Sequence, residues 1–338
     1  MGRGTNALLG LLAVALLGGA GTLVWAADES DGELAKKTQN PVAGLIEPRL
    51  FLPRAHPWLT HPPEIQEAEA TSESEGTPAP AGTGEQAQSL SEVNRQLTNP
   101  VTSIWSLTFQ FNNYRLDNGT LSANMLFQPV LPVSLTEDWN LINRPVLPIY
   151  QSNPRPTLGT FHQTTTFGDI ADAEMISPAH SGNWLLGVGP TFIFPTAGSV
   201  WTGQGHYQMG PAGVLGYLTK QYIVGVFPQQ WWSIDGKQEQ PAVSQMNLQP
   251  FAAWFLPNGW SVGYSGNILA NWHADNAERW TVPLGASVAK VVKLGPLPVR
   301  IALAGQYMVE HPSVIGQEWN VQLIVAPVIP KLFKGTIF

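Results

Sequence analysis

One stretch of sequence limits the fold more than any other. It is SIWSLTFQFNN, residues 103–113, in which apolar and polar side chains alternate. The odd positions carry Trp105, Leu107, Phe109 and Phe111, and the even positions carry Ser106, Thr108, Gln110 and Asn112. Side chains of a β-strand alternate between its two faces, so this pattern predicts a strand with one aromatic, apolar face and one polar face.

The same alternation returns along the rest of the chain, with clear examples at 259–272, 279–291, 299–307 and 319–325. Asn-Gly pairs at 118–119 and 258–259 are typical of the tight turns that close hairpins. Counting in this way gives about twelve strands of mostly about 11 to 14 residues, which is longer than the usual ~5 to 6. Six prolines fall inside these predicted strands, where they mark strand ends, bulges or misplaced boundaries: Pro129, Pro145, Pro190, Pro211, Pro250 and Pro283.

A sheet can turn an apolar face to lipid only if it closes on itself, because an open edge leaves backbone groups unpaired in hydrocarbon. The predicted fold class is therefore all-β, a transmembrane antiparallel β-barrel of about 12 strands. A large soluble β-sandwich is the alternative, since its strands also alternate. Its apolar face would form a core rich in Val, Ile and Leu, whereas these strands carry aromatic residues at their ends.

The amino-terminal third differs from this pattern. Residues 1–26 have the outline of a secretory signal peptide, with Arg3, an uncharged run and the small-x-small site Val24-Trp25-Ala26; a retained membrane anchor is the alternative. Residues 27–100 are predicted to be a periplasmic arm with short helical segments, and 101–338 the barrel. The sequence contains no Cys, which excludes disulfides and thiolate metal sites.

The arm also carries the net charge of the protein, which is −7. Residues 64–92 hold seven of the 24 acidic residues and none of the 17 basic ones, so the rest of the chain is neutral. Their Glu, Ser, Pro and Gly content predicts an unstructured linker. Two segments, 33–46 and 91–105, share a short helical pattern that ends in Asn-Pro-Val, either by chance or as a duplicated lead-in to the first strand.

Several motifs occur in a fixed order over residues 100–338: EDWNLINRPVLPI, FGDI, WWSIDG, NLQPF, NWHADNAERWTVPLG, KLGPLPV and the ending PVIPKLFKGTIF. Together they resemble a bacterial outer-membrane family named for transport in the meta-pathway of phenol degradation, and often mis-titled neuromedin U. ELAKKTQNPVAGLI, residues 33–46, is similar to the mature amino terminus of that family, which normally runs almost directly into the first strand. The resemblance implies a β-barrel in the Gram-negative outer membrane, and the long arm is a departure from it.

Strand parity sorts the candidate functional residues. The predicted pore-lining set is Ser106, Thr108, Gln110, Asn112, Asn124, Gln128, Asn140, Arg144, Asp172, Glu174, His206, Gln208, Gln249, Asn267, Arg300, Gln306 and Gln322. The predicted lipid-interface aromatics are Trp105, Trp254, Trp260, Trp272, Trp280 and Trp319. Among the few inward charges, Arg144 and Arg300 with Asp172 and Glu174 form either a lumenal salt bridge or a polar constriction. Phe338 is a terminal aromatic of the kind that outer-membrane assembly machinery reads.

The nearly uncharged inner wall predicts a porin-like channel or transporter for small neutral or mildly apolar solutes. A closed structural barrel whose arm binds an envelope partner is the alternative. No enzyme activity is expected, because neither His273 with Asp275 nor His162 with Asp169 has a Ser at the spacing of a known motif. No cofactor, metal or nucleic acid is expected. The predicted partners are outer-membrane lipid, the assembly machinery and a small-molecule solute, with both termini in the periplasm.

Overall fold

The structure is a computed structural model that describes residues 82–157, 160–236, 240–313, 315–331 and 337. The predicted signal peptide and residues 27–81 of the arm lie outside the described residues. The described chain begins with the helix α3 (Gly82–Thr98), so residues 82–92 of the predicted linker 64–92 are helical. Pro80 is the last proline before this helix, and the residues after it include several good helix formers.

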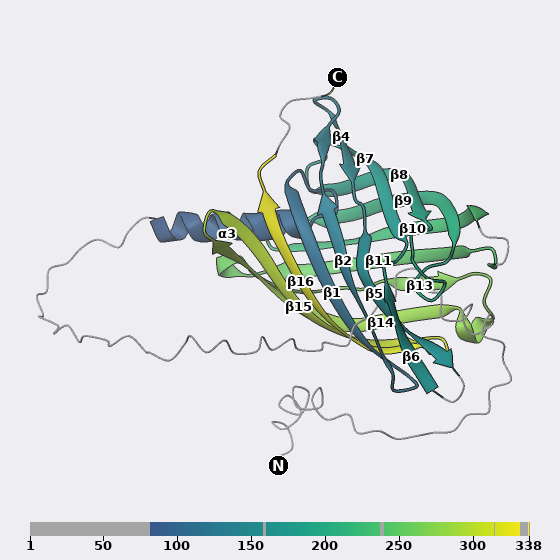
Figure 1. Ribbon diagram of the computed structural model, residues 1–338. Helices are drawn as coiled ribbons and strands as arrows, with labels where there is room; N and C mark the ends of the chain where they lie inside the picture. Colours follow the sequence, from purple (N-terminus) through teal and green to yellow (C-terminus); the bar gives the residue numbers. More distant parts are fainter. Residues whose placement is uncertain (1–81, 158–159, 237–239, 314, 332–336, 338) are drawn as a thin grey trace, which may run out of the picture.

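Sixteen strand segments follow α3 in one antiparallel sheet (Figure 1). They are β1 (Trp105–Leu116), β2 (Leu121–Val130), β3 (Val133–Ser134), β4 (Trp139–Asn143), β5 (Leu147–Thr157), β6 (Thr160–Thr166), β7 (Ile170–Pro178), β8 (Trp184–Phe194), β9 (His206–Leu218), β10 (Tyr222–Gly236), β11 (Ser244–Phe255), β12 (Trp260–Ser265), β13 (Ile268–Asn271), β14 (Trp280–Leu294), β15 (Leu297–Glu310) and β16 (Gln317–Ile329). Two short 3-10 turns, η2 (Pro257–Gly259) and η3 (Asn276–Glu278), lie between strands.

Four pairs of these segments are single strands of the wall with a short irregularity between them. The pairs Gln151↔Thr166 and Val146↔Ala171 are five residues apart on each strand. The segments β4–β5 and β6–β7 therefore share one antiparallel register. The same holds for β2–β3 against β4–β5, and for β12–β13 against β11. Sixteen segments therefore make twelve wall strands, which confirms the predicted fold class.

The wall closes on itself through the first and last strands. β1 pairs with β16 from Trp105↔Ile329 to Leu116↔Gln317. Every wall strand then has a neighbour on each side, so the backbone groups of the wall are paired around the ring apart from local interruptions at bulges and prolines. Because Trp105 and Ile329 are partners, the first strand begins and the last strand ends at the same end of the barrel, as an even strand count requires.

The outer face of the ring is apolar. β8 shows this most simply, since Trp184, Leu186, Val188, Pro190 and Phe194 are exposed and the residues between them are buried or half-buried. Val188 is 68% exposed. None of the helices among the described residues is long and apolar enough to cross a membrane.

Aromatic side chains form two belts around this face. Trp254 and Trp260 are exposed near one end, while Trp272, Trp280 and Trp319 lie near the other, exposed or half-buried. Trp260 and Trp272 are twelve residues apart. At ~3.3 Å per residue and a tilt of ~40° this is about 30 Å, close to the thickness of the hydrocarbon layer. Trp139 and Trp184 add to the first belt, although strand alternation alone had not singled them out.

Trp105 does not belong to either belt, contrary to the sequence prediction. Its side chain is only 5% exposed, and its indole N–H donates to the carbonyl oxygen of Pro132 at 2.9 Å. The N–H of Ile337 donates to the carbonyl oxygen of Ser134 two residues further along, so Ile337 lies beside this part of the wall. A residue at a strand end can be covered by chain outside the strands, which parity alone does not predict.

The assignment of faces can be tested by placing one charge on each. Leu323 is exposed at the middle of β16, so Leu323→Arg should cost roughly 2–4 kcal/mol of unfolding free energy in a bilayer. Thr108→Arg, on the inner face of β1, is the matched control and should change the free energy much less. Urea unfolding in liposomes measures both, and an equal cost at the two positions would show that the register is wrong.

Candidate functional site

The inner face of the barrel is lined by polar but mostly uncharged side chains. The positions that the sequence assigned to this face, and that the structure places on it, are Ser106, Thr108, Gln110, Asn112, Asn124, Gln128, Asn140, Arg144, His206, Gln208, Gln249, Asn267, Arg300, Gln306 and Gln322. Many of them are almost inaccessible, including Asn112 at 1% and Gln208 at 1% exposure. The lumen is therefore largely filled in this conformation.

Asp172 and Glu174 do not line the lumen, and the prediction for these two residues is wrong. Met125 pairs with Tyr150 whereas Leu126 pairs with Pro148, so one extra residue bulges from the strand that carries β4 and β5. A bulge of one residue exchanges the faces beyond it. On β7 the inward residues are consequently Ala173 and Met175, which are 2% and 0% exposed.

The two carboxylates instead face outward. Asp172 pairs with Phe192 and Glu174 pairs with Asn143, whose side-chain amide donates to both carboxylates. One oxygen of each carboxylate, Asp172 Oδ1 and Glu174 Oε2, is buried without a hydrogen-bond partner. They lie six and four residues from Pro178, where β7 ends. That places them about 15 and 10 Å into the apolar band.

Removing these carboxylates should stabilise the barrel. We expect Asp172→Leu with Glu174→Leu to raise the unfolding free energy in liposomes by about 1 kcal/mol or more, because ionisable side chains facing hydrocarbon are costly. Gln208→Leu, a similar change on the inner face, should lower it, because Gln208 hydrogen-bonds other buried amides. A double variant that is less stable than the parent would contradict the outward placement.

The two inward arginines also differ from expectation, because neither forms the predicted salt bridge with Asp172 or Glu174. Arg144 donates to the carbonyl oxygen of Pro100 at 3.1 Å, and its guanidinium lies 5.5 Å from the ring centroid of Phe227. Arg300 donates from Nε to Oδ1 of Asn94 at 3.2 Å. Both arginines therefore hold the segment that precedes the first strand.

That segment covers the end of the barrel where the wall begins and ends. In Figure 1, α3 runs into the barrel wall, where it contacts the η2 turn and the neighbouring ends of β14 and β15. Asn94 is fully buried there, and its Nδ2 donates to the carbonyl oxygen of Gly259 at 3.1 Å. The N–H of Gly259 in turn donates to Oγ of Ser91 at 3.3 Å. Gly259 has a φ of 76°, a conformation that favours glycine, so the η2 turn is shaped to meet the helix.

After α3 the chain passes further into the lumen. Pro100 is buried, and Val101 packs against an apolar cluster on the inner face. This cluster consists of Ile142, Ala173, Met175, Leu185, Ala212, Val214, Leu218, Ile223, Phe227, Phe251 and Phe255. We name α3 together with residues 99–104 the inner plug, because it closes this end of the barrel with side chains that are not part of the wall.

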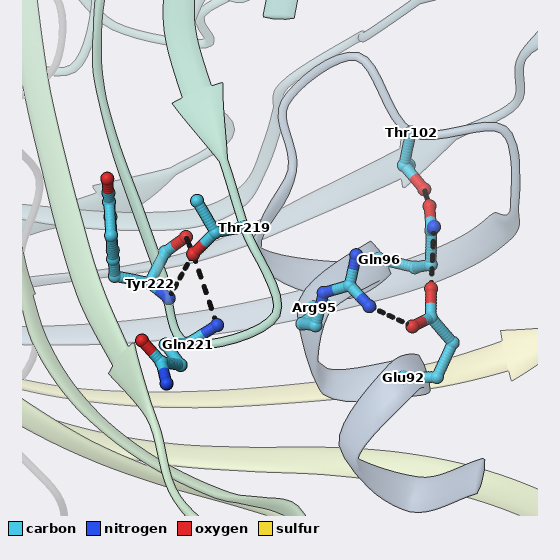
Figure 2. Close-up of polar contacts among 7 residues, drawn as sticks. All are labelled: Glu92, Arg95, Gln96, Thr102, Thr219, Gln221 and Tyr222. Atoms are coloured by element: carbon cyan, nitrogen blue, oxygen red, sulfur yellow. Dashed lines mark hydrogen bonds and ion pairs between the residues drawn. The ribbon is translucent and has the colours of Figure 1, made fainter. Parts of the chain in front are cut away.

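Figure 2 shows two separate sets of polar contacts, one within the inner plug and one within the β9–β10 turn. Within the plug, Glu92 accepts from Arg95 and from Gln96, and Gln96 Oε1 accepts from Thr102 Oγ1 at 3.1 Å. The bond between Gln96 and Thr102 ties the helix to the chain that follows it. Within the β9–β10 turn, Oγ1 of Thr219 accepts from the backbone N–H groups of Gln221 and Tyr222.

A network of amides spans the seam of the barrel toward the other end. Asn112 Oδ1 accepts from Gln322 at 2.8 Å and from Asn320 at 3.3 Å, and its Nδ2 donates to Asn124 at 2.6 Å. Asn320 also donates to Gln306 at 2.9 Å. Four neighbouring wall strands contribute to this network, and all of its members are uncharged.

The end of the barrel opposite the plug is covered by residues 195–205, between β8 and β9. Gln204 in this segment exchanges hydrogen bonds of 2.9 Å with Gln245 of β11, and Gln208 donates to it at 2.6 Å. On the inner face, the indole of Trp231 in β10 donates over the intervening strand β9 to Oγ1 of Thr191 in β8 at 3.1 Å. We name residues 195–205 the outer segment.

Sequence reasoning did not find either closing element. The sequence predicts a linker over residues 64–92 and, from strand parity, an outward loop near 195–204, because neither has a periodic apolar face. The signals that could have found them are Asn-Pro-Val at 99–101, directly before the first strand, and three glycines at 198, 203 and 205. Asp169 and His273, considered as parts of a catalytic pair, instead accept or share hydrogen bonds with loop backbone.

Comparison with known proteins adds the following. No family model matches the chain, and no curated protein matches it, so the resemblance to the phenol-degradation family stays a prediction. An outer membrane channel from Pseudomonas putida F1 has 13% identity and a TM-score of 0.49, covering 67% of this chain and 94% of its own. The NanC porin has 8% identity and a TM-score of 0.43, covering 67% and 99%.

An outer membrane phospholipase from Salmonella typhi, solved with bound calcium, has 14% identity and a TM-score of 0.36, covering 73% of this chain and 99% of its own. Likenesses this distant assign no function to the chain.

Proposed function

We propose that the protein is an outer-membrane channel for small neutral or mildly apolar solutes, and that the conformation described here is its closed state. The observation that carries this proposal is that both ends of the lumen are closed by chain that is not part of the wall. The inner plug and the outer segment are held by side-chain hydrogen bonds and packing. Either could leave its place while the ring of twelve strands stays paired.

The solute class follows from the chemistry of the inner face. Its amides are uncharged and can both donate and accept hydrogen bonds, which suits neutral polar groups and gives an ion no compensating charge. The apolar cluster near the inner plug presents Phe227, Phe251 and Met175 to the same path. A solute that crosses must therefore tolerate both a polar and an apolar surface.

The orientation is part of the same proposal. The aromatic belts and the apolar outer face support a position across a bilayer. The wall begins and ends at the plugged end, and the proposed signal peptide implies export, so we place this end and both termini in the periplasm. Lipid of the outer membrane is then the partner of the outer face.

A closed structural barrel whose arm binds an envelope partner is the second candidate. The near-complete burial of Asn112, Asn320 and Gln208 favours it, because a permanently open channel would hydrate these side chains. Flux separates the two. Proteoliposome swelling should be faster with benzyl alcohol and glycerol than with benzoate or benzylamine, and planar bilayers should show openings. Absence of both flux and conductance, from protein shown to be folded by its heat-dependent migration on gels, would favour the structural barrel.

A further inference from the structure

The outer segment crosses almost the full width of the barrel. Near one side, Nδ2 of Asn153 donates to the carbonyl oxygen of Trp201 at 2.5 Å. On the other side, Gln204 bonds Gln245. Asn153 belongs to the third wall strand and Gln245 to the eighth, which are five positions apart in a ring of twelve and so nearly opposite. The outer segment therefore lies over the lumen and not beside it.

One carboxylate holds both halves of this segment. Asp169, between β6 and β7, is only 8% exposed. Its Oδ1 accepts from the N–H of Ala197 at 3.0 Å, and its Oδ2 accepts from the N–H of Gln204 at 2.6 Å. Hydrogen bonds to an ionised acceptor are about twice as strong as neutral ones. A single side chain thus fixes the segment at two points seven residues apart.

The outer segment is shaped to reach Asp169. A Cβ placed on Gly203 would lie 2.5 Å from Asp169 Oδ1 and 2.2 Å from Cβ of Ala197. A Cβ on Gly198 would lie 2.1 Å from Oγ1 of Thr166. All three distances are shorter than a real Cβ contact, so any larger residue at these positions would force the outer segment or its neighbours to shift.

We propose that residues 195–205 are a lid over the outer mouth and that Asp169 is the positioning residue that latches it shut. This proposal goes beyond the channel function. Only one part of it rests on the proposed function, namely that solute enters when the lid opens. The lid has no β-ladder with the wall strands among the described residues, so its position depends on a few side-chain and backbone bonds, with the buried carboxylate at their centre.

The chain contains no Cys, which allows the lid to be probed with a single introduced thiol. Thr202 in the lid is 3% exposed, so Thr202→Cys should react slowly with a polar maleimide while the lid is closed. Adding Asp169→Asn replaces one accepting oxygen with an N–H₂ group, which then faces the backbone N–H of Ala197 or Gln204 and cannot accept from it. We expect labelling to be about tenfold faster or more, the factor that corresponds to losing a charged hydrogen bond. Asp117→Asn, the same change in the exposed β1–β2 turn, should leave the rate at the parental value.

Gly203→Ala supplies a second variant that opens the lid without altering Asp169, in case the first does not fold. If both variants fold and label at the parental rate, the latch is wrong. Swelling of proteoliposomes made from the same variants keeps this result separate from the proposed function. Faster labelling without any solute flux supports the latch and contradicts the channel. Flux in the parent with no change in labelling contradicts the latch alone.

Discussion

Removing both closing elements at once should turn the protein into a steadily conducting pore. The change is deletion of residues 64–98, which removes α3, combined with Asp169→Asn in the wall. The inner plug and the lid close the same lumen in series, so each change alone should raise conductance much less than the two together. The wall should survive, because its ladder begins at Trp105 and α3 contributes no strand to it.

Single-channel recording in planar bilayers measures this effect. The expected result is brief, small openings in the parent, somewhat longer ones in each single variant, and an order-of-magnitude larger steady current in the combination. Asn94→Ala provides a milder version of the deletion, since it removes the bonds to Gly259 and Arg300 and leaves the helix in place. A folded combination variant that does not conduct would leave the structural barrel as the better account.

Deleting Phe338 should sharply reduce the amount of folded barrel in cells. Phe338 lies outside the described residues, so this prediction comes from its sequence position as a terminal aromatic that the assembly machinery reads. Ile337, directly before it, donates its N–H to the carbonyl oxygen of Ser134, which places Ile337 at the end of the barrel where β1 begins and β16 ends. The band of unboiled protein that migrates differently from boiled protein measures the folded amount in the outer-membrane fraction.

The matched control is deletion of residues 64–81, which precede α3 and should leave that amount unchanged. The shorter range replaces the whole predicted linker 64–92, because residues 82–92 belong to α3. Equal amounts of folded protein with and without Phe338 would show that the carboxyl end does not direct assembly.

Much of the wall could be predicted from sequence because each wall strand divides lipid from lumen. Side chains that face lipid therefore alternate along the strand with side chains that face the lumen. β15 and β16 follow this alternation almost without exception. The positions of most turns followed from the same pattern. An exception is the outward loop that strand parity predicts near residues 151–160, because β5 continues through Thr157 and pairs with β6.

The other features of the structure depend on contacts between residues far apart in sequence, which the spacing of residues within one strand does not predict. The bulge at Ile149 exists only in relation to the register of β2, so the faces of Asp172 and Glu174 could not be read from their own spacing. The burial of Trp105 depends on chain beyond its strand. The inner plug and the lid are stabilised by contacts between residues far apart in sequence, such as Asn94 with Arg300, and neither needs a periodic pattern to form.

The pairing of β1 with β16 also determines when the barrel can close during folding. Trp105 and Ile329, which are partners, are separated by 224 residues of sequence, so the ring closes by the most distant contact in its wall. Until the last strand arrives, the sheet has two free edges that can pair with other chains. Contacts of such long range form slowly, and incomplete sheets aggregate. A chain whose barrel has not yet closed therefore needs chaperones that keep it from aggregating until β16 pairs with β1.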